Sequence, residues 1–290
     1  MFHTVLVPLD GTPQSNISLP LVRTLAQATG GSVTLVRVVP ASHVRGDNRA
    51  LREAGQSLER VADELAGGGV AVHPVIREGD DTPHEILGLT QDIAADVIVM
   101  RTHGRVGLQR AVLGSVTEQV LAHSSVPLIL LRPGGRRVTH IRKLLVPVDG
   151  SPGGAVALTT VIDLARATGA AIKVLQIVVP IPTQVYGMFS SGGLAYYDSA
   201  WDDDALASAK GYVDAVATRL RGLGLDIEAD AQMAPDVPTA IVGAAHEANA
   251  DLIAMSTQAL TGPARALLGS VADAVVRSAD CPVLLVHRGS

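Results

Sequence analysis

Two short segments of this chain combine residue types that could hold a phosphorylated ligand. Asp10-Gly11 follows an apolar run, and Gly114-Ser115 comes directly before an apolar helical pattern. Glycine lets a backbone approach a phosphate closely, and the free N–H groups at a helix start attract an anion. The carboxylate of Asp10 can accept hydrogen bonds from ribose hydroxyls. Together these residues could bind a nucleotide without a nucleophile or a metal site.

The same residues also have a purely structural interpretation. Ser115-Val116-Thr117-Glu118 has the pattern of a capping box, and a helix start needs a cap whether or not a phosphate binds there. Asp10 beside Gly11 is equally typical of the turn that ends a strand. Neither segment by itself therefore identifies a binding site.

The elements that would position these residues occur twice. LVPLDGTP at 6–13 returns as LVPVDGSP at 145–152, and VPLILLRPG at 126–134 has its counterpart in CPVLLVHRG at 281–289. A period this long indicates two copies of one globular domain rather than a solenoid. We expect the domains to span residues 1–134 and 143–290, joined by a short polar linker at 132–142.

Within each copy, short β-branched runs alternate with helical patterns. The runs are apolar on both faces, which is typical of a parallel sheet covered by helices on both sides. The alternation predicts a doubly wound α/β fold. In the first copy the expected strands are Val5–Leu9, Val33–Val39, Val70–Ile76, Val97–Met100 and Val126–Leu131.

The second copy is longer than the first. The offset between the copies grows from 139 residues at Asp10 to 155 at Gly114, so 16 extra residues lie near 181–205. Five of the seven aromatic residues of the chain fall in this insertion. One interpretation is a surface loop whose aromatic rings pack on a neighbouring part of the protein. The other is a lid or a partner-contact loop. We expect the acidic run 202–204 to be a solvated helix start.

Composition excludes several function classes. The net charge is −5 with no long basic run, which disfavours nucleic acid as a partner. Apolar runs are too short to span a bilayer, and no signal peptide is readable, so we expect a cytoplasmic protein without a membrane partner. The single cysteine, Cys281, starts an apolar run and is interpreted as a buried, inert thiol. No metal site is expected, because the nine histidines include no His-x3-His pair.

Each copy resembles a universal stress protein domain. The resemblance rests on LVPLDGTP, on the closing strand VPLILLRP, and on a Gly-x2-Gly-x9-Gly-[Ser/Thr] element in which nine residues separate Gly104 from Gly114. It implies two tandem Rossmann-like domains of the adenine nucleotide α-hydrolase-like type, each a five-stranded parallel sheet with helices on both faces. It also implies that the two copies pair through their last strands, and it leaves a homodimer of two chains open.

The resemblance implies a nucleotide-binding site in the first copy. Its residues would be Pro8, Asp10, Val38, Met100, Gly104, Gly107, Gly114, Ser115 and Val116. Arg101 stands where the family has its first glycine. It could crowd the ribose and phosphate, or its guanidinium could add a phosphate contact.

The second copy departs further from the family pattern, because Ser256 and Ala259 replace both early glycines. A second, weaker site is expected at Asp149, Ile177, Gly269, Ser270 and Val271. The two sites should therefore be unequal, with binding mainly in the first domain.

The resemblance implies a stress-responsive protein that binds ATP or a related adenine nucleotide, with Mg²⁺ left open. No general base is recognisable, so no catalytic residue is assigned and slow ATP hydrolysis is the most that we expect. The main alternative is a pairing scaffold of the same fold that binds no nucleotide, which Arg101, Ser256 and Ala259 favour. A nucleotide α-hydrolase or a phospho-accepting receiver fits the loops after the strands less well.

Overall fold

The fold is described from a computed structural model of the chain. It describes residues 1–44, 48–102, 113–151, 153–180, 200–257 and 268–287. Gly104, Gly107 and Ala259 lie outside these ranges, and so does most of the insertion.

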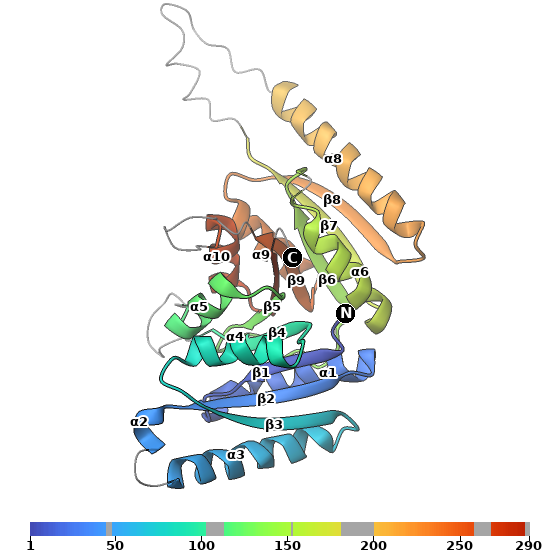
Figure 1. The fold of residues 1–290 in the computed structure, drawn as a ribbon. Helices are drawn as coiled ribbons and strands as arrows, with labels where there is room; N and C mark the ends of the chain where they lie inside the picture. The colour runs from blue at the N-terminus through green and yellow to red at the C-terminus, as the bar shows by residue number, and fades with distance from the viewer. Residues whose placement is uncertain (45–47, 103–112, 152, 181–199, 258–267, 288–290) are drawn as a thin grey trace, which may run out of the picture.

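The described residues form one continuous ten-stranded sheet (Figure 1). Its order is β3-β2-β1-β4-β5-β10-β9-β6-β7-β8, so the second half repeats the strand order of the first in reverse. The strands are β1 (Thr4–Pro8), β2 (Ser32–Val39), β3 (Ala71–Glu78), β4 (Val97–Arg101), β5 (Leu128–Leu131), β6 (Lys143–Val148), β7 (Ala171–Val178), β8 (Ile227–Met233), β9 (Leu252–Thr257) and β10 (Val283–His287).

Within each half the strands are parallel, as the apolar runs predict. The two halves meet through β5 and β10, which pair antiparallel with Ile129 opposite Leu284. The expected pairing of the two copies through their last strands is therefore present within one chain.

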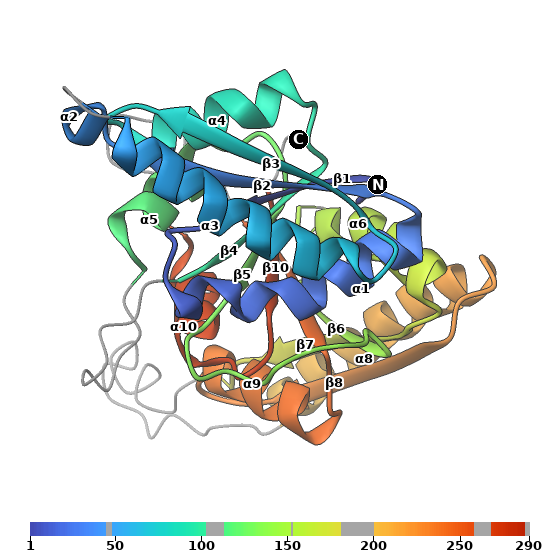
Figure 2. The same ribbon diagram turned by 90° about the horizontal axis from the view of Figure 1, so that it is seen from below.

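Helices cover both faces of this sheet (Figure 2). Helices α1, α3, α6 and α8 bury side chains in the core on one face, and α4, α5, α9 and α10 do so on the other. The helices are η1 (a 3-10 helix, Pro13–Ser18), α1 (Leu19–Thr29), α2 (Ala41–Val44), α3 (Arg49–Ala66), α4 (Thr82–Asp92), α5 (Ser115–His123), α6 (Val156–Thr168), α8 (Ala200–Arg221), α9 (Val237–Glu247) and α10 (Ser270–Ser278).

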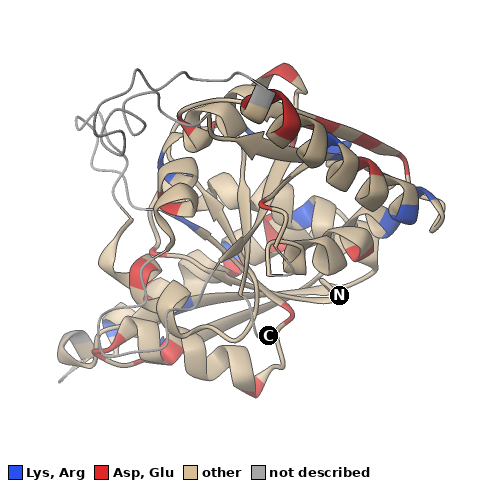
Figure 3. Cartoon of the chain, turned by 90° about the horizontal axis from the view of Figure 1, so that it is seen from above, with Lys and Arg blue, Asp and Glu red and all other residues tan. Residues whose placement is uncertain are grey.

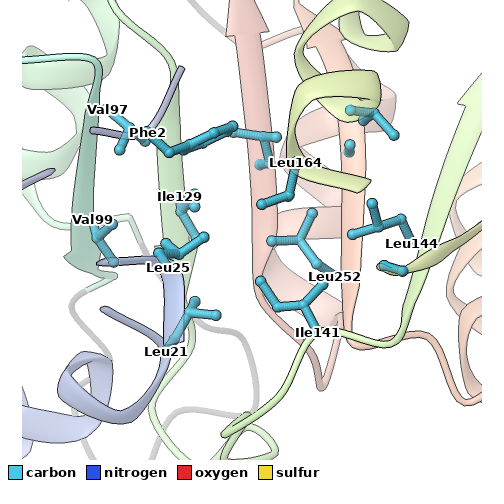
Figure 4. Close-up of a cluster of buried hydrophobic side chains, with 14 of the residues drawn as sticks. Phe2, Leu21, Leu25, Val97, Val99, Ile129, Ile141, Leu144, Leu164 and Leu252 are labelled. Carbon is cyan, nitrogen blue, oxygen red and sulfur yellow. The ribbon is translucent and has the colours of Figure 1, made fainter. Parts of the chain in front are cut away.

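The core runs across the junction between the domains. In Figure 4, Leu25 and Ile129 of the first domain lie in one buried cluster with Leu164 and Leu252 of the second. All four side chains are fully or almost fully buried. Since burying one such side chain contributes about 1.5–3 kcal/mol, the shared core holds the two domains in a fixed arrangement.

Two expectations from the sequence need correction. Ser115 does not cap α5: Gly114 is the N-cap, and no side chain accepts a hydrogen bond there. Asp202 lies in the first turn of α8 but is buried rather than solvated, while its neighbour Trp201 is half exposed. Cys281 is buried as expected. No helix among the described residues is long and apolar enough to cross a membrane.

Candidate functional site

The first domain has a cavity of about 240 Å³ where β1, β2 and β4 end. Ligands bind at this edge of open α/β sheets. Five residues that the sequence assigns to the site line it: Pro8, Asp10, Val38, Met100 and Val116. Gly114 and Ser115 stand at the start of α5 but do not line the cavity, and Arg101 does.

An ion pair occupies the polar side of this cavity. Arg101 Nη2 donates a hydrogen bond to Asp10 Oδ2 across 3.1 Å, and the Arg101 side chain is 12% exposed. The other carboxylate oxygen of Asp10 accepts bonds from the backbone N–H and the hydroxyl of Thr12, at 2.8 and 2.6 Å. Asp10 is therefore engaged by the protein itself before any ribose arrives.

These contacts set the charge of Asp10. Partial burial raises the pKa of its carboxyl, but hydrogen bonds from Thr12 and Ser15 and the charge of Arg101 outweigh it, so that the pKa lies below its ordinary value. Asp10 is consequently an ionised acceptor at neutral pH.

The second domain has a larger cavity at the equivalent place, of about 420 Å³. It lies within the range of about 300–1,000 Å³ that is usual for small-molecule sites, whereas the first cavity falls below it. All five residues that the sequence assigns to the second site line it: Asp149, Ile177, Gly269, Ser270 and Val271.

Two substitutions explain the extra space. Ser256 stands where the first domain has Arg101, and Gly154 stands where it has Ser15. The hydroxyl of Ser256 turns to the start of α6, where it accepts from Ala157 N at 3.0 Å and donates to Gly154 O at 3.1 Å. No arginine or lysine lines this cavity within the described part of the chain.

Gly154 also permits a close approach that no other residue would allow. A Cβ atom there would lie 2.0 Å from Asp149 Oδ1. Asp149 in turn accepts from the backbone N–H and hydroxyl of Ser151, at 2.9 and 2.6 Å, as Asp10 does from Thr12. The carboxylate is thus oriented at the cavity wall in the same way in both domains.

The start of α10 completes the second cavity. Gly269 is its N-cap, no side chain caps the helix, and Ser270, Val271 and Ala272 of the first turn line the cavity. The first N–H groups of a helix have no partner within it. Among the described residues, a Cβ built on Gly269 would meet nothing within 4 Å, so their packing does not require glycine there. The space suits a group that approaches the backbone closely.

Sequence reasoning missed the far wall of each cavity. Thr82 and Ile86 of α4 line the first, and Val237 and Ile241 of α9 line the second. The signal that could have found them is the proline in the first turn of each helix, which marks a helix starting just beyond a strand end. Met255 and Pro147 also line the second cavity, as the counterparts of Met100 and Pro8.

Comparison with known proteins agrees with this architecture. The sequence model of the universal stress protein family matches residues 1–132 and again residues 140–287. The chain belongs to the universal stress protein family. It is a tandem member, in which both halves of the ten-stranded sheet are family domains.

Relatives of this universal stress protein match one domain at a time. Universal stress protein MJ0577 of Methanocaldococcus jannaschii is 26% identical over 157 residues, which cover 46% of this chain and 96% of the relative. Universal stress protein MJ0531 of the same organism is 30% identical over 142 residues, covering 46% of this chain and 83% of the relative. The crystal structure of a universal stress protein from Archaeoglobus fulgidus DSM 4304 covers 100% of both chains with a TM-score of 0.75 and 20% identity, which shows the shared fold.

Proposed function

We propose that this universal stress protein binds an adenine nucleotide such as ATP, and that the cavity of the second domain is its main site. The observation that carries the proposal is the open cavity of about 420 Å³ between Asp149 and the uncapped start of α10. Both features are of the kind that the family resemblance implies for nucleotide binding.

Different residues that line the second cavity would contact the adenine, the ribose and the phosphates of the nucleotide. Ile177, Ile241 and Met255 supply apolar wall for the adenine ring. The carboxylate of Asp149 accepts hydrogen bonds from the ribose hydroxyls. The N–H groups of the first turn of α10 receive a phosphate, with the macrodipole contributing about 0.3–1 kcal/mol for an exposed charge.

The first domain is proposed as the weaker site. The glycine spacing in the sequence favours the first domain as the main site. The geometry of the described residues favours the second domain. A ribose must displace Arg101 from Asp10, or share that carboxylate with it. The smaller cavity, of about 240 Å³, further weakens the binding that we expect in the first domain.

Any Mg²⁺ is proposed to arrive with the phosphates. No cluster of three or more His, Cys, Asp or Glu side chains suited to a metal ion occurs among the described residues. Since a ligand that binds only the folded state stabilises it, nucleotide binding would couple the stability of the shared core to the concentration of ATP. We propose this coupling as the basis of a stress or energy-state response.

A melting experiment tests the proposal. ATP at a hundredfold excess over its Kd should stabilise the fold by about 2.7 kcal/mol, which is visible as a raised Tm. Ser256→Arg, which installs the side chain of the first domain in the second cavity, should remove most of the shift. If saturating ATP leaves the Tm of the wild type unmoved, the protein is the pairing scaffold, a reading that the continuous β5–β10 junction favours.

A further inference from the structure

A further cavity among the described residues is separate from both nucleotide sites. Its volume is about 570 Å³, and it lies between α1 and the linker that joins the domains. Its walls come from η1 and α1, from the end of α3, from residues 131–140, and from Asp280, Cys281 and Pro282 just before β10. A ligand there would touch both domains at once.

The linker is fixed in place as one wall of this cavity. Thr24 of α1 donates from its hydroxyl to the carbonyl of Thr139 at 2.6 Å. Gly135 lies so close to the second domain that a Cβ atom there would be 2.8 Å from Asp280 O. Because contacts to both domains hold the linker, the cavity is a preformed feature of the fold.

Arginine side chains gather around the cavity although the chain as a whole is acidic. Arg23, Arg132, Arg136 and Arg137 line it, against the carboxylates of Glu64 and Asp280. Over the molecule as a whole, basic and acidic residues are interspersed on the elements of both domains (Figure 3). The cavity therefore holds a local excess of positive charge.

Several of these arginines are only partly engaged by the protein. Arg136 pairs with Asp251 at 3.3 Å and also donates to the carbonyl of Ala250, and Arg23 donates to Glu64 O at 2.8 Å. Within the described ranges, no hydrogen bond or ion pair holds the side chain of Arg132 or Arg137. The Nε atoms of Arg23 and Arg132 are buried and find no acceptor in the described part of the chain.

Leaving a charged donor buried without an acceptor costs free energy. An arginine fork pairs well with the two oxygens of a phosphate or a carboxylate. The buried Nε of Arg132, with the exposed guanidinium of Arg137 beside it at the same cavity, therefore points to an anionic ligand rather than to a neutral one.

The arginines are not a by-product of the domain duplication. The counterpart of Arg23 in the second domain is Ile162, and the counterpart of Arg132 is His287. The linker that carries Arg136 and Arg137 exists once in the chain. The cationic cavity is thus specific to the tandem arrangement of this protein.

We propose that this linker cavity binds a small organic anion bearing two or more phosphate or carboxylate groups. Arg132 and Arg137 are its principal charged contacts, and apolar residues such as Ile17 and Leu65 contact its uncharged part. The cavity volume of about 570 Å³ lies within the usual range for such ligands.

Calorimetric titration with inorganic pyrophosphate and with citrate, at 0.15 M salt, tests this proposal. The variant is Arg132→Gln with Arg137→Gln. The matched control is Arg166→Gln with Arg219→Gln, two exposed arginines on α6 and α8 that change the net charge equally. We expect the wild type to bind at least one probe, the variant to lose at least tenfold in affinity, and the control to stay within twofold.

The site is overturned if neither probe binds the wild type at millimolar concentration. It is equally overturned if variant and control lose the same affinity. The Tm of the ligand-free variant should stay close to that of the wild type, because no hydrogen bond or ion pair between described residues is removed. A lowered Tm with unchanged affinity would make the arginines structural and would also refute the proposal. ATP binding to the second domain should persist in the variant, which separates this site from the nucleotide site.

Discussion

Arg101 Nη2 lies 3.1 Å from Asp10 Oδ2 in the first domain, whereas the equivalent pair in the second domain, Ser256 and Asp149, shares no hydrogen bond that the structure shows. The serine instead binds the backbone at the start of α6. One residue difference thus decides whether the side chain at this position bonds to the carboxylate or to the backbone. It makes two copies of one fold unequal as binding sites.

Arg101→Ser should open the first domain. Removing the guanidinium removes its hydrogen bond to Asp10 and enlarges the cavity, so we expect the affinity of this domain for ATP to rise by about tenfold, or about 1.4 kcal/mol. Calorimetry should then report two sites per chain. The mirror variant Ser256→Arg should weaken the second domain. A stoichiometry that neither variant alters would refute the role assigned to this position.

Gly269→Val should weaken ATP binding far more than it weakens the fold. The glycine has φ −52°, and a Cβ there meets nothing within 4 Å, so the ligand-free protein should lose at most about 1 kcal/mol as an N-cap change. The side chain would nevertheless fill the space next to the first turn of α10. Gly211→Val, at an equally open position on α8, is the control. A loss of folding in Gly269→Val would make that glycine structural.

Asp10→Asn should destabilise the protein more at pH 7 than at pH 3. The pKa of Asp10 is lower in the folded protein than the value of about 3.9 expected when it is unfolded. Its contribution is therefore present above about pH 4 and is lost as the pH falls through the folded pKa. Urea unfolding at both pH values measures the difference. An equal penalty for Asp10→Asn at both pH values would contradict the prediction.

Cys281 should be unreactive in the folded protein. Burial raises the pKa of its thiol to about 12, and the residue is 3% exposed. Since the thiolate is the reactive form, a disulfide reagent at pH 8 should modify the native protein at least about a hundredfold more slowly than the protein unfolded in guanidinium. Equal rates would show that the segment before β10 opens readily.

Leu284→Ala should destabilise both domains together. Leu284 faces Ile129 across the antiparallel β5–β10 pair, and both side chains are fully buried. We expect the free energy of unfolding to fall by about 2–5 kcal/mol in a single transition. Two separate transitions, one of them unaffected by the substitution, would show that the domains fold independently. Coupling between Leu284→Ala and Ile129→Ala would locate the effect at the junction.

The sequence predicts most of this architecture because repetition and apolar runs are strong, local signals. The paired LVPLDGTP and LVPVDGSP segments place Asp10 and Asp149 at equivalent strand ends, and the structure puts both at cavity walls. The pairing of the closing strands, seen between β5 and β10, is implied by the family resemblance and not by a local signal.

The relative openness of the two cavities could not be predicted in this way. It depends on where the long side chain of Arg101 points, which the ion pair with Asp10 decides and which no spacing rule contains. The linker cavity could not be predicted from the sequence either, because it depends on the path of residues 131–140 between α1 and β10. Ser115 shows a smaller limit: a capping-box pattern places a helix start only to within a residue, and Gly114 takes the cap.

The most direct test of the account is a crystal structure of the protein grown with ATP. We predict electron density for the nucleotide in the second domain, with the ribose hydroxyls within hydrogen-bond distance of Asp149 and a phosphate at the N–H groups of Ser270 and Val271. Density confined to the first domain, with the second cavity empty at saturating ATP, would contradict the central claim.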